Sequence, residues 1–128
     1  MDAFNGSKYI NEAKEKWGGT AAYAEFSEKT KGYSGERFAE MASGLDMITG
    51  DFALCMQKDP KPDSPEAQNL VEKLQNYITK NYYTCTDEIL AGLGQMYSAD
   101  ERFKANIDRH AEGTAGFISA AVRIYCGR

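Results

Sequence analysis

Apolar residues recur at steps of three and four along most of this 128-residue chain. Between residues 34 and 58 they form one stripe, made of Phe38, Met41, Leu45, Ile48, Phe52 and Cys55. Comparable stripes run through residues 65–83, 87–97 and 114–126. Steps of three and four place side chains on one face of an α-helix, whereas a half-buried strand needs alternation with a period of two. The pattern therefore predicts an all-α fold.

Serine and proline residues mark where three of these helices should begin. Ser34 precedes the first stripe, and Ser64 precedes Pro65, which suits an N-cap followed by proline at the first helical position. Ser98 is followed three residues later by Glu101, the spacing of a capping box. We therefore expect helices to begin after residues 34, 64 and 98.

Two short charged segments, residues 7–16 and 20–30, precede the long stripes. Their apolar residues are mostly aromatic, namely Tyr9, Trp17, Tyr23 and Phe26. Helices of this length are marginal unless they pack on something. Two outcomes fit: a mobile lid that orders on a ligand, or two helices that are docked permanently. We expect one domain covering 1–128, with lid helices in 7–33 and a helical core in 34–128.

The overall charge and hydropathy exclude several classes of function. The net charge is −4, and the Lys and Arg residues are mixed with acids, as in EAKEK and EKTK. Nucleic-acid binding needs a clustered basic face, so we expect none by this chain itself. No apolar run approaches the ~20 residues of a membrane span, and MDAFNGSKY does not resemble a signal peptide. We therefore expect a cytoplasmic protein without membrane contact.

The side chains that carry most enzymatic chemistry are sparse. A nucleophilic cysteine needs a base, usually histidine, and the single histidine here is His110, in a segment where the helix dipole alone favours it. Cys55, Cys85 and Cys126 stand at wide spacings without a CxxC pair, which does not suit zinc. The chain also lacks GxSxG, P-loop and HExxH motifs. We predict neither catalysis, nor a metal site, nor a cofactor.

Aromatic and sulfur-containing residues are abundant, and two glycines interrupt a helical stripe. The chain has eight tyrosines, six phenylalanines and five methionines, residues that suit either a core or an adaptable ligand pocket. Gly92 and Gly94 lie within one turn, where each costs ~0.5–1 kcal/mol relative to alanine. Either a close helix–helix contact or the close approach of a ligand would offset that cost.

Two blocks of the sequence resemble the TipAS domain, the C-terminal antibiotic-recognition domain of certain MerR-type transcription activators. These blocks are KYINEAKEKWGGTAAYAEFSEKTKGYS and YYTCTDEILAGLGQMYSADERFKANID. The resemblance implies a globin-like fold of about six or seven helices without haem. It also implies an aromatic cleft for multi-ring peptide antibiotics or bulky drugs, with N-terminal helices that order on the ligand. In whole regulators, a dimerising coiled coil and a helix-turn-helix would relay the signal to DNA.

The chain departs from the family at one position. In the founding member, a cysteine captures thiopeptides covalently by adding to a dehydroalanine, and the matching position here is Gly92. Cys85 remains, but it would need a lowered pKa to react in its place. We therefore expect reversible binding. The predicted ligand-binding residues are Trp17, Tyr23, Tyr82, Tyr83, Cys85, Ile89, Gly92, Met96 and Phe103.

Other functions remain open at the level of sequence. The domain could be a stand-alone drug-sequestering protein, which an upstream in-frame helix-turn-helix in the coding sequence would exclude. A haem- or gas-binding globin relative would need a histidine facing a cavity. A structural interaction domain would keep all its aromatic residues in the core.

Overall fold

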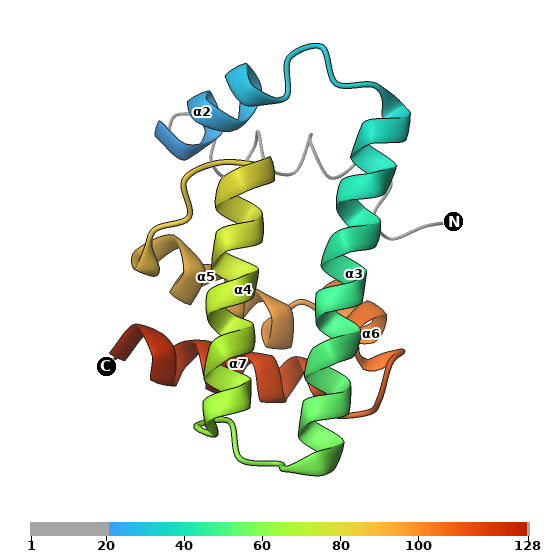
Figure 1. The fold of residues 1–128 in the computed structure, drawn as a ribbon, viewed down its shortest axis with the longest axis vertical. Helices are drawn as coiled ribbons and strands as arrows, with labels where there is room; N and C mark the ends of the chain where they lie inside the picture. The colour runs from blue at the N-terminus through green and yellow to red at the C-terminus, as the bar shows by residue number, and fades with distance from the viewer. Residues whose placement is uncertain (1–20, 128) are drawn as a thin grey trace.

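The structure, a computed structural model, describes the backbone of residues 21–127 and the side chains of residues 24–127. Its helices keep the labels of Figure 1, which start at α2. They are α2 (Ala21–Lys29), α3 (Gly35–Lys58), α4 (Pro65–Asn81), α5 (Asp87–Ala99), α6 (Glu101–Asp108) and α7 (Thr114–Gly127). The predicted all-α fold is confirmed for this part of the chain. The helix expected over 7–16 lies outside the described residues.

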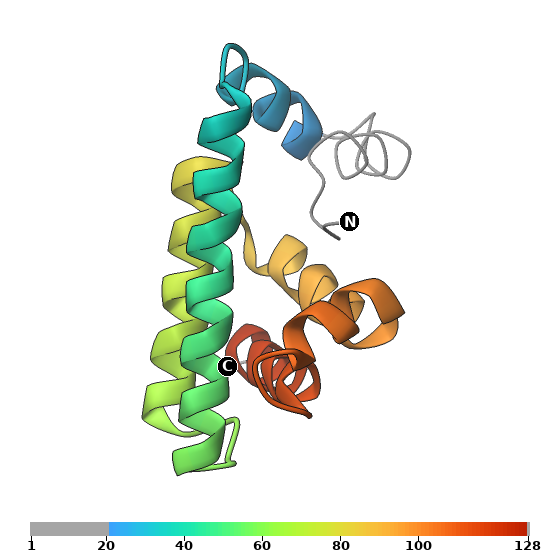
Figure 2. The same ribbon diagram turned by 90° about the vertical axis from the view of Figure 1, so that its right-hand side faces the viewer.

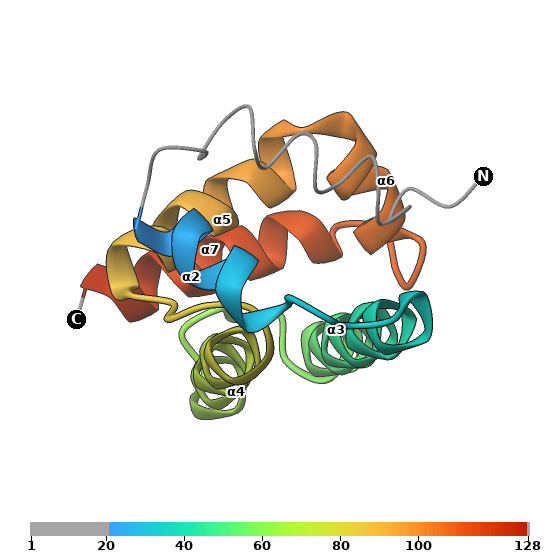
Figure 3. The same cartoon turned by 90° about the horizontal axis from the view of Figure 1, so that it is seen from above.

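Helix α7 lies between two layers of helices. The long helices α3 and α4 lie side by side and antiparallel, and α2 lies near the end where α3 begins and α4 finishes (Figures 1 and 2). Seen from above, α7 runs between this pair and the helices α5 and α6 (Figure 3). Helix α7 accordingly contacts α3, α4, α5 and α6. None of the described helices is both long and apolar enough to cross a membrane.

The core forms where α7 meets the other helices. Phe52 of α3 and Phe117 of α7 meet edge to face, with ring centroids 6.4 Å apart and an interplanar angle of 73°. That geometry is the favoured one for aromatic pairs. Helix α7 is buried on most of its sides, as expected for a helix with few polar residues. Its buried residues are Thr114, Ala115, Phe117, Ile118, Ser119, Ala121, Val122 and Tyr125.

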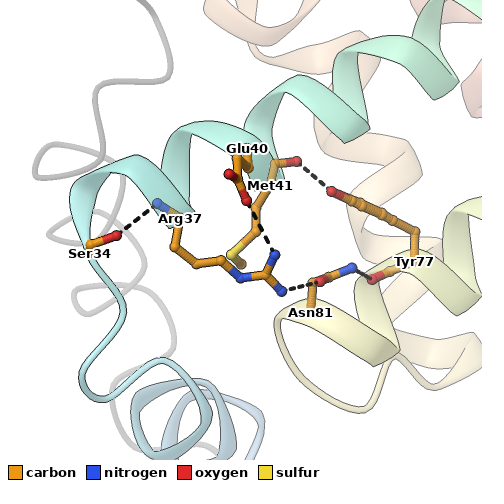
Figure 4. A network of polar contacts seen from close by, with 6 residues as sticks. All are labelled: Ser34, Arg37, Glu40, Met41, Tyr77 and Asn81. Carbon is orange, nitrogen blue, oxygen red and sulfur yellow. Dashed lines mark hydrogen bonds and ion pairs between the residues drawn. The ribbon is translucent and has the colours of Figure 1, made fainter.

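Helices α3 and α4 are joined by polar contacts between their facing residues (Figure 4). The Tyr77 hydroxyl donates to the Met41 carbonyl at 2.9 Å. A Cβ on Gly44 would clash with the Tyr77 ring, so glycine is required there. Nearby, Arg37 Nη2 donates to Asn81 Oδ1 at 3.0 Å. These contacts fix the two long helices against each other near the end that faces α2.

Two of the three predicted helix starts are confirmed. The Ser34 hydroxyl accepts from the Arg37 N–H at 3.1 Å. The Ser64 hydroxyl accepts from the Ala67 N–H at 3.2 Å, with Pro65 in the first turn. Both helices therefore have one of their otherwise unpaired N–H groups satisfied by the cap.

The predicted start after Ser98 is wrong. Ser98 lies inside α5 and its hydroxyl contacts Ser119 Oγ at 3.2 Å. The next helix, α6, is capped by Asp100, whose carboxylate accepts from the Arg102 N–H at 3.0 Å. The Arg102 guanidinium also bonds this carboxylate, and these hydrogen bonds hold the pKa of Asp100 at about 2. A charged acceptor with two partners is stronger than a serine hydroxyl, so α5 continues to Ala99.

The link between α6 and α7 is fastened by two aspartates. Asp108 Oδ1 accepts from the Ala115 N–H at 2.8 Å, so a carboxylate of α6 caps the start of α7. Asp46 of α3 accepts from Arg109 Nη2 at 2.8 Å and lies 2.9 Å from His110 Nε2. His110 therefore joins this link to α3, two residues beyond the end of α6.

Candidate functional site

The loop between α4 and α5 is tied to α4 by its backbone. The Cys85 N–H donates to Thr79 Oγ1 at 3.1 Å, and the Cys85 carbonyl accepts from Gln75 Nε2 at 2.9 Å. One residue later, the Thr86 hydroxyl accepts from the Ile89 N–H at 3.2 Å and caps α5. The segment that holds Cys85 is therefore an ordered connection with a fixed helix start.

The thiol of Cys85 is unsuited to attack on a bound ligand at neutral pH. The residue is 4% exposed, and burial, followed by the effects of Cys126 and Asp87, raises its pKa to about 12. A thiol with that pKa is almost wholly protonated at neutral pH, whereas the thiolate is the nucleophile. His110, the single histidine, is engaged with Asp46 on α3. A haem-binding role would need this histidine to face a cavity, whereas its Nε2 lies 2.9 Å from Asp46 Oδ1.

The two glycines of α5 have different surroundings. A Cβ on Gly94 would lie 2.8 Å from Val122 Cγ1 of α7, closer than such atoms approach. A Cβ on Gly92 would meet nothing within 4 Å, and this residue is exposed. Gly94 thus allows α5 and α7 to touch, whereas no contact within the described residues requires glycine at 92.

Gly92 is flanked on one face of α5 by two apolar side chains. Ile89, Gly92 and Met96 follow each other at steps of three and four, which places them on one side of the helix. Ile89 and Met96 are half-buried and pack against the edge of the core, while Gly92 between them is exposed. We name Ile89, Gly92 and Met96 the Gly92 face. It is an apolar strip with bare backbone at its centre.

Helix α2 is docked on the loop that leads to α5. The Phe26 and Tyr82 rings are stacked, with centroids 6.2 Å apart and an interplanar angle of 12°. Lys29 Nζ donates to the Thr79 carbonyl at 2.8 Å. The Thr84 hydroxyl donates to Glu25 Oε2 at 2.7 Å, and hydrogen bonds from Thr84 lower the pKa of Glu25. The aromatic stack and these polar contacts join α2 to the end of α4 and its loop.

Of the remaining predicted site residues, two are buried and two have side chains outside the described part of the chain. Tyr83 and Phe103 are 7% and 8% exposed, Tyr83 within the core and Phe103 beside Tyr97, with ring centroids 6.2 Å apart. Trp17 lies outside the described residues, as does the side chain of Tyr23. The structure therefore places Tyr82 at the end of α4 and Cys85 just before α5, with Ile89, Gly92 and Met96 along α5.

Two residues beside the loop between α4 and α5 were not among the predicted ligand-binding residues. Phe26 forms the stack with Tyr82, and its place among the aromatic residues of the first segments was the only signal for it. Gln75 bonds Cys85, Asp87 and Tyr125 at once. Nothing in the sequence marks it, because a glutamine on a helix is ordinarily solvated. Among the described residues, no group of three or more His, Cys, Asp or Glu side chains could hold a metal ion.

The fold and the Gly92 face together define an all-helical domain that carries an apolar strip on α5, while α2 is docked on the loop that leads to this helix. The structure of TipAS from Streptomyces lividans, solved in complex with nosiheptide, has the same fold. It agrees with a TM-score of 0.84 and 34% sequence identity, over 98% of this chain and 87% of that one.

The family model of the TipAS antibiotic-recognition domain matches residues 9–125, and the chain belongs to this family. It is 34% identical over 119 residues to the HTH-type transcriptional activator TipA of Streptomyces coelicolor, covering 93% of this chain and 47% of that protein. It is 33% identical over 118 residues to the HTH-type transcriptional activator mta of Bacillus subtilis, covering 92% and 45%. The chain thus spans about half the length of these regulators, and the resemblance in the sequence is confirmed.

Proposed function

We propose that this chain is the ligand-sensing domain of a MerR-type transcription regulator. Its ligands would be bulky peptidic antibiotics of the thiopeptide class, or hydrophobic drugs of similar size. The observation that carries the proposal is the match to TipAS in complex with nosiheptide, at a TM-score of 0.84 over 98% of the chain. Its task is binding rather than catalysis. As such regulators act on DNA, we place it in the cytoplasm.

The ligand would lie along the Gly92 face and reach Tyr82 at the end of α4. A helix surface without a side chain lets a bulky ring approach the backbone, while the two flanking apolar side chains exclude water. Helix α2, the described part of the proposed lid over 7–33, would close over the ligand, and Trp17 and Tyr23 would belong to that lid. Tyr83, Cys85 and Phe103 would form the buried floor of the site.

Binding would be reversible. The Cys85 thiol is buried, and its pKa of about 12 keeps it protonated, so it does not add to an alkene at neutral pH. The resemblance to the family implies that its reactive cysteine would stand at the position of Gly92. Because Gly92 is exposed and a Cβ built there would meet nothing within 4 Å among the described residues, a thiol introduced at this position would be accessible.

A pair of glycine variants tests the position of the site. Gly92→Leu fills the proposed contact surface, whereas Gly116→Leu adds the same side chain to an exposed glycine of α7 that also has nothing within 4 Å. With nosiheptide at a hundred times its dissociation constant, the folded state gains ~2.7 kcal/mol. We expect the melting temperature of the wild type and of Gly116→Leu to rise, and that of Gly92→Leu to change much less.

The proposal fails if neither nosiheptide nor any other thiopeptide raises the melting temperature of the wild type. The position of the site fails if both leucine variants respond to the ligand like the wild type.

Intact-mass measurement tests reversibility. After incubation with a thiopeptide that contains dehydroalanine, the wild type should keep its own mass after denaturation. Gly92→Cys should gain the mass of the peptide, because its thiol sulfur bonds to the alkene and its proton passes to the adjacent carbon. An adduct on wild-type Cys85 would contradict reversible binding.

A further inference from the structure

Two cysteine thiols converge on the first turn of α5. Cys85, which precedes this helix, has its Sγ 3.9 Å from the Thr86 carbonyl oxygen. Cys126, in the last turn of α7, has its Sγ 3.3 Å from the Asp87 carbonyl oxygen. Thr86 and Asp87 are consecutive, and successive residues of a helix rise only ~1.5 Å. The two sulfur atoms therefore contact neighbouring peptide groups.

A side chain of α4 holds the two cysteine-bearing segments together. Gln75 Nε2 donates to the Cys85 carbonyl at 2.9 Å, and Gln75 Oε1 accepts from the Tyr125 hydroxyl at 3.1 Å. Tyr125 is the chain neighbour of Cys126. The thiols also affect each other, because after burial Cys126 is the next cause of the raised pKa of Cys85.

We propose that Cys85 and Cys126 are a redox-active pair that forms an intramolecular disulfide when the protein meets a hydroperoxide. Cys126 is partly exposed and reacts first, whereas Cys85 is buried and resolves the intermediate. Cys55, the third cysteine, is buried beside Ser64 and Glu66 and lies outside this pair. The bond would connect the loop before α5 to the end of α7.

The chemistry balances with one peroxide and two thiols. The Cys126 sulfur takes one oxygen of hydrogen peroxide and becomes a sulfenic acid, with release of one water. The Cys85 thiol then passes its proton to the sulfenic acid oxygen as its sulfur bonds to the Cys126 sulfur, so that this oxygen leaves as a second water. The two thiols lose two electrons, and the peroxide is reduced to two waters.

The cross-link would close a loop that contains α5, α6 and most of α7. Such a loop restricts the unfolded chain and so favours the folded state. The bond would also pin the start of the Gly92 face, although its formation does not depend on any ligand.

Mass spectrometry of the wild-type domain tests the pair. After treatment with equimolar hydrogen peroxide, we expect the protein to lose the mass of two hydrogen atoms. Proteolysis without reductant should then yield one linked peptide that contains Cys85 and Cys126. The melting temperature should rise, and dithiothreitol should restore the original mass and melting temperature.

Variants show which thiols take part. Cys126→Ser should give no linked peptide, whereas Cys55→Ser should give the same linked peptide as the wild type. The proposal is overturned if peroxide produces covalent dimers through Cys126. Stable sulfinic acid at Cys126, with Cys85 still open to alkylation after unfolding, would overturn it too. Both results are read on wild-type protein, so no variant has to fold for the decision.

Discussion

Gly94 and Gly92 stand two residues apart in α5, and their roles follow from what a side chain would meet. At Gly94 a Cβ would lie 2.8 Å from Val122 Cγ1. The β-branched side chain of valine has few rotamers with which to move away. At Gly92 the space is open. Gly94 therefore allows α5 to pack on α7. Gly92 lowers helix stability, and no packing contact in the described structure offsets this cost.

Alanine at each position should change stability in opposite directions. Gly94→Ala should destabilise the fold by ~1–3 kcal/mol, because the core has to shift around the new methyl group. Gly92→Ala should stabilise it by ~0.5–1 kcal/mol through helix propensity alone. Urea unfolding measures both values. Stabilisation by Gly94→Ala would mean that α5 and α7 are farther apart than the structure has them.

The Cys85 thiol should make stability depend on pH in the alkaline range. Its pKa is raised from 9.0 to about 12 by burial, so the unfolded chain loses this proton at lower pH than the folded one. The stabilisation is complete below pH 9 and is lost as the pH rises towards 12. The unfolding free energy of the wild type should therefore fall relative to that of Cys85→Ala between these limits. Parallel pH profiles would refute the shift.

At the scale of elements, α2 lies near the surface, because its side chains at residues 24–29 are all half-buried or exposed. The described part of this helix is attached by the Phe26–Tyr82 stack, the bond from Lys29 to Thr79 and the bond from Thr84 to Glu25. Local opening takes least free energy where few buried contacts hold an element. Helix α2 should thus open more readily than the helices around α7.

Removing the stacked ring should free α2 without unfolding the domain. In Phe26→Ala we expect faster hydrogen exchange of the backbone amides of residues 25–30, because the aromatic contact with Tyr82 is lost. Amides of α3 and α7 should keep their protection. Ser27→Ala, an exposed change on the same helix, is the control. Equal protection of α2 in both variants would show that the polar contacts alone hold it.

The sequence predicted helices better than the features between them. The apolar stripes and the caps Ser34 and Ser64 were correct, because each depends on residues a few positions apart. The start after Ser98 was wrong, since the bidentate contact of Arg102 with Asp100 is a side-chain geometry that spacing does not reveal. At the candidate site, the sequence suggested that either a helix–helix contact or a ligand could explain the two glycines of α5. Only the position of Val122 shows that the helix–helix contact applies to Gly94 and not to Gly92.

At the scale of the whole molecule, α7 holds helices α3 to α6 together. It contacts α3, α4, α5 and α6, and its Ile118 is 2% exposed. The stripes predicted which side chains are buried, but they could not predict which helix lies at the centre. That arrangement depends on contacts between residues far apart in the chain. The resemblance to the TipAS family therefore predicted the arrangement of the helices, which the periodicity of apolar residues could not.

A core residue of α7 should matter far more than an exposed apolar residue elsewhere. Ile118→Ala should cost ~2–5 kcal/mol, through lost burial and the cavity that remains. Leu54→Ala removes a side chain of α3 that is 61% exposed, and it should change stability by ~0.5 kcal/mol or less. Thermal unfolding of both variants measures the difference. Similar costs would contradict the central place of α7.

The central place of α7 also has a consequence for the order in which the chain is made. Helices α3 to α6 leave the ribosome before the helix on which all four pack, so their apolar faces have no complete partner during that interval. A nascent chain that stops before Thr114 should remain open to proteases and to chaperones that bind apolar segments. Protection should appear abruptly once Phe117 to Tyr125 have emerged, because these residues supply the surface on which the four earlier helices pack.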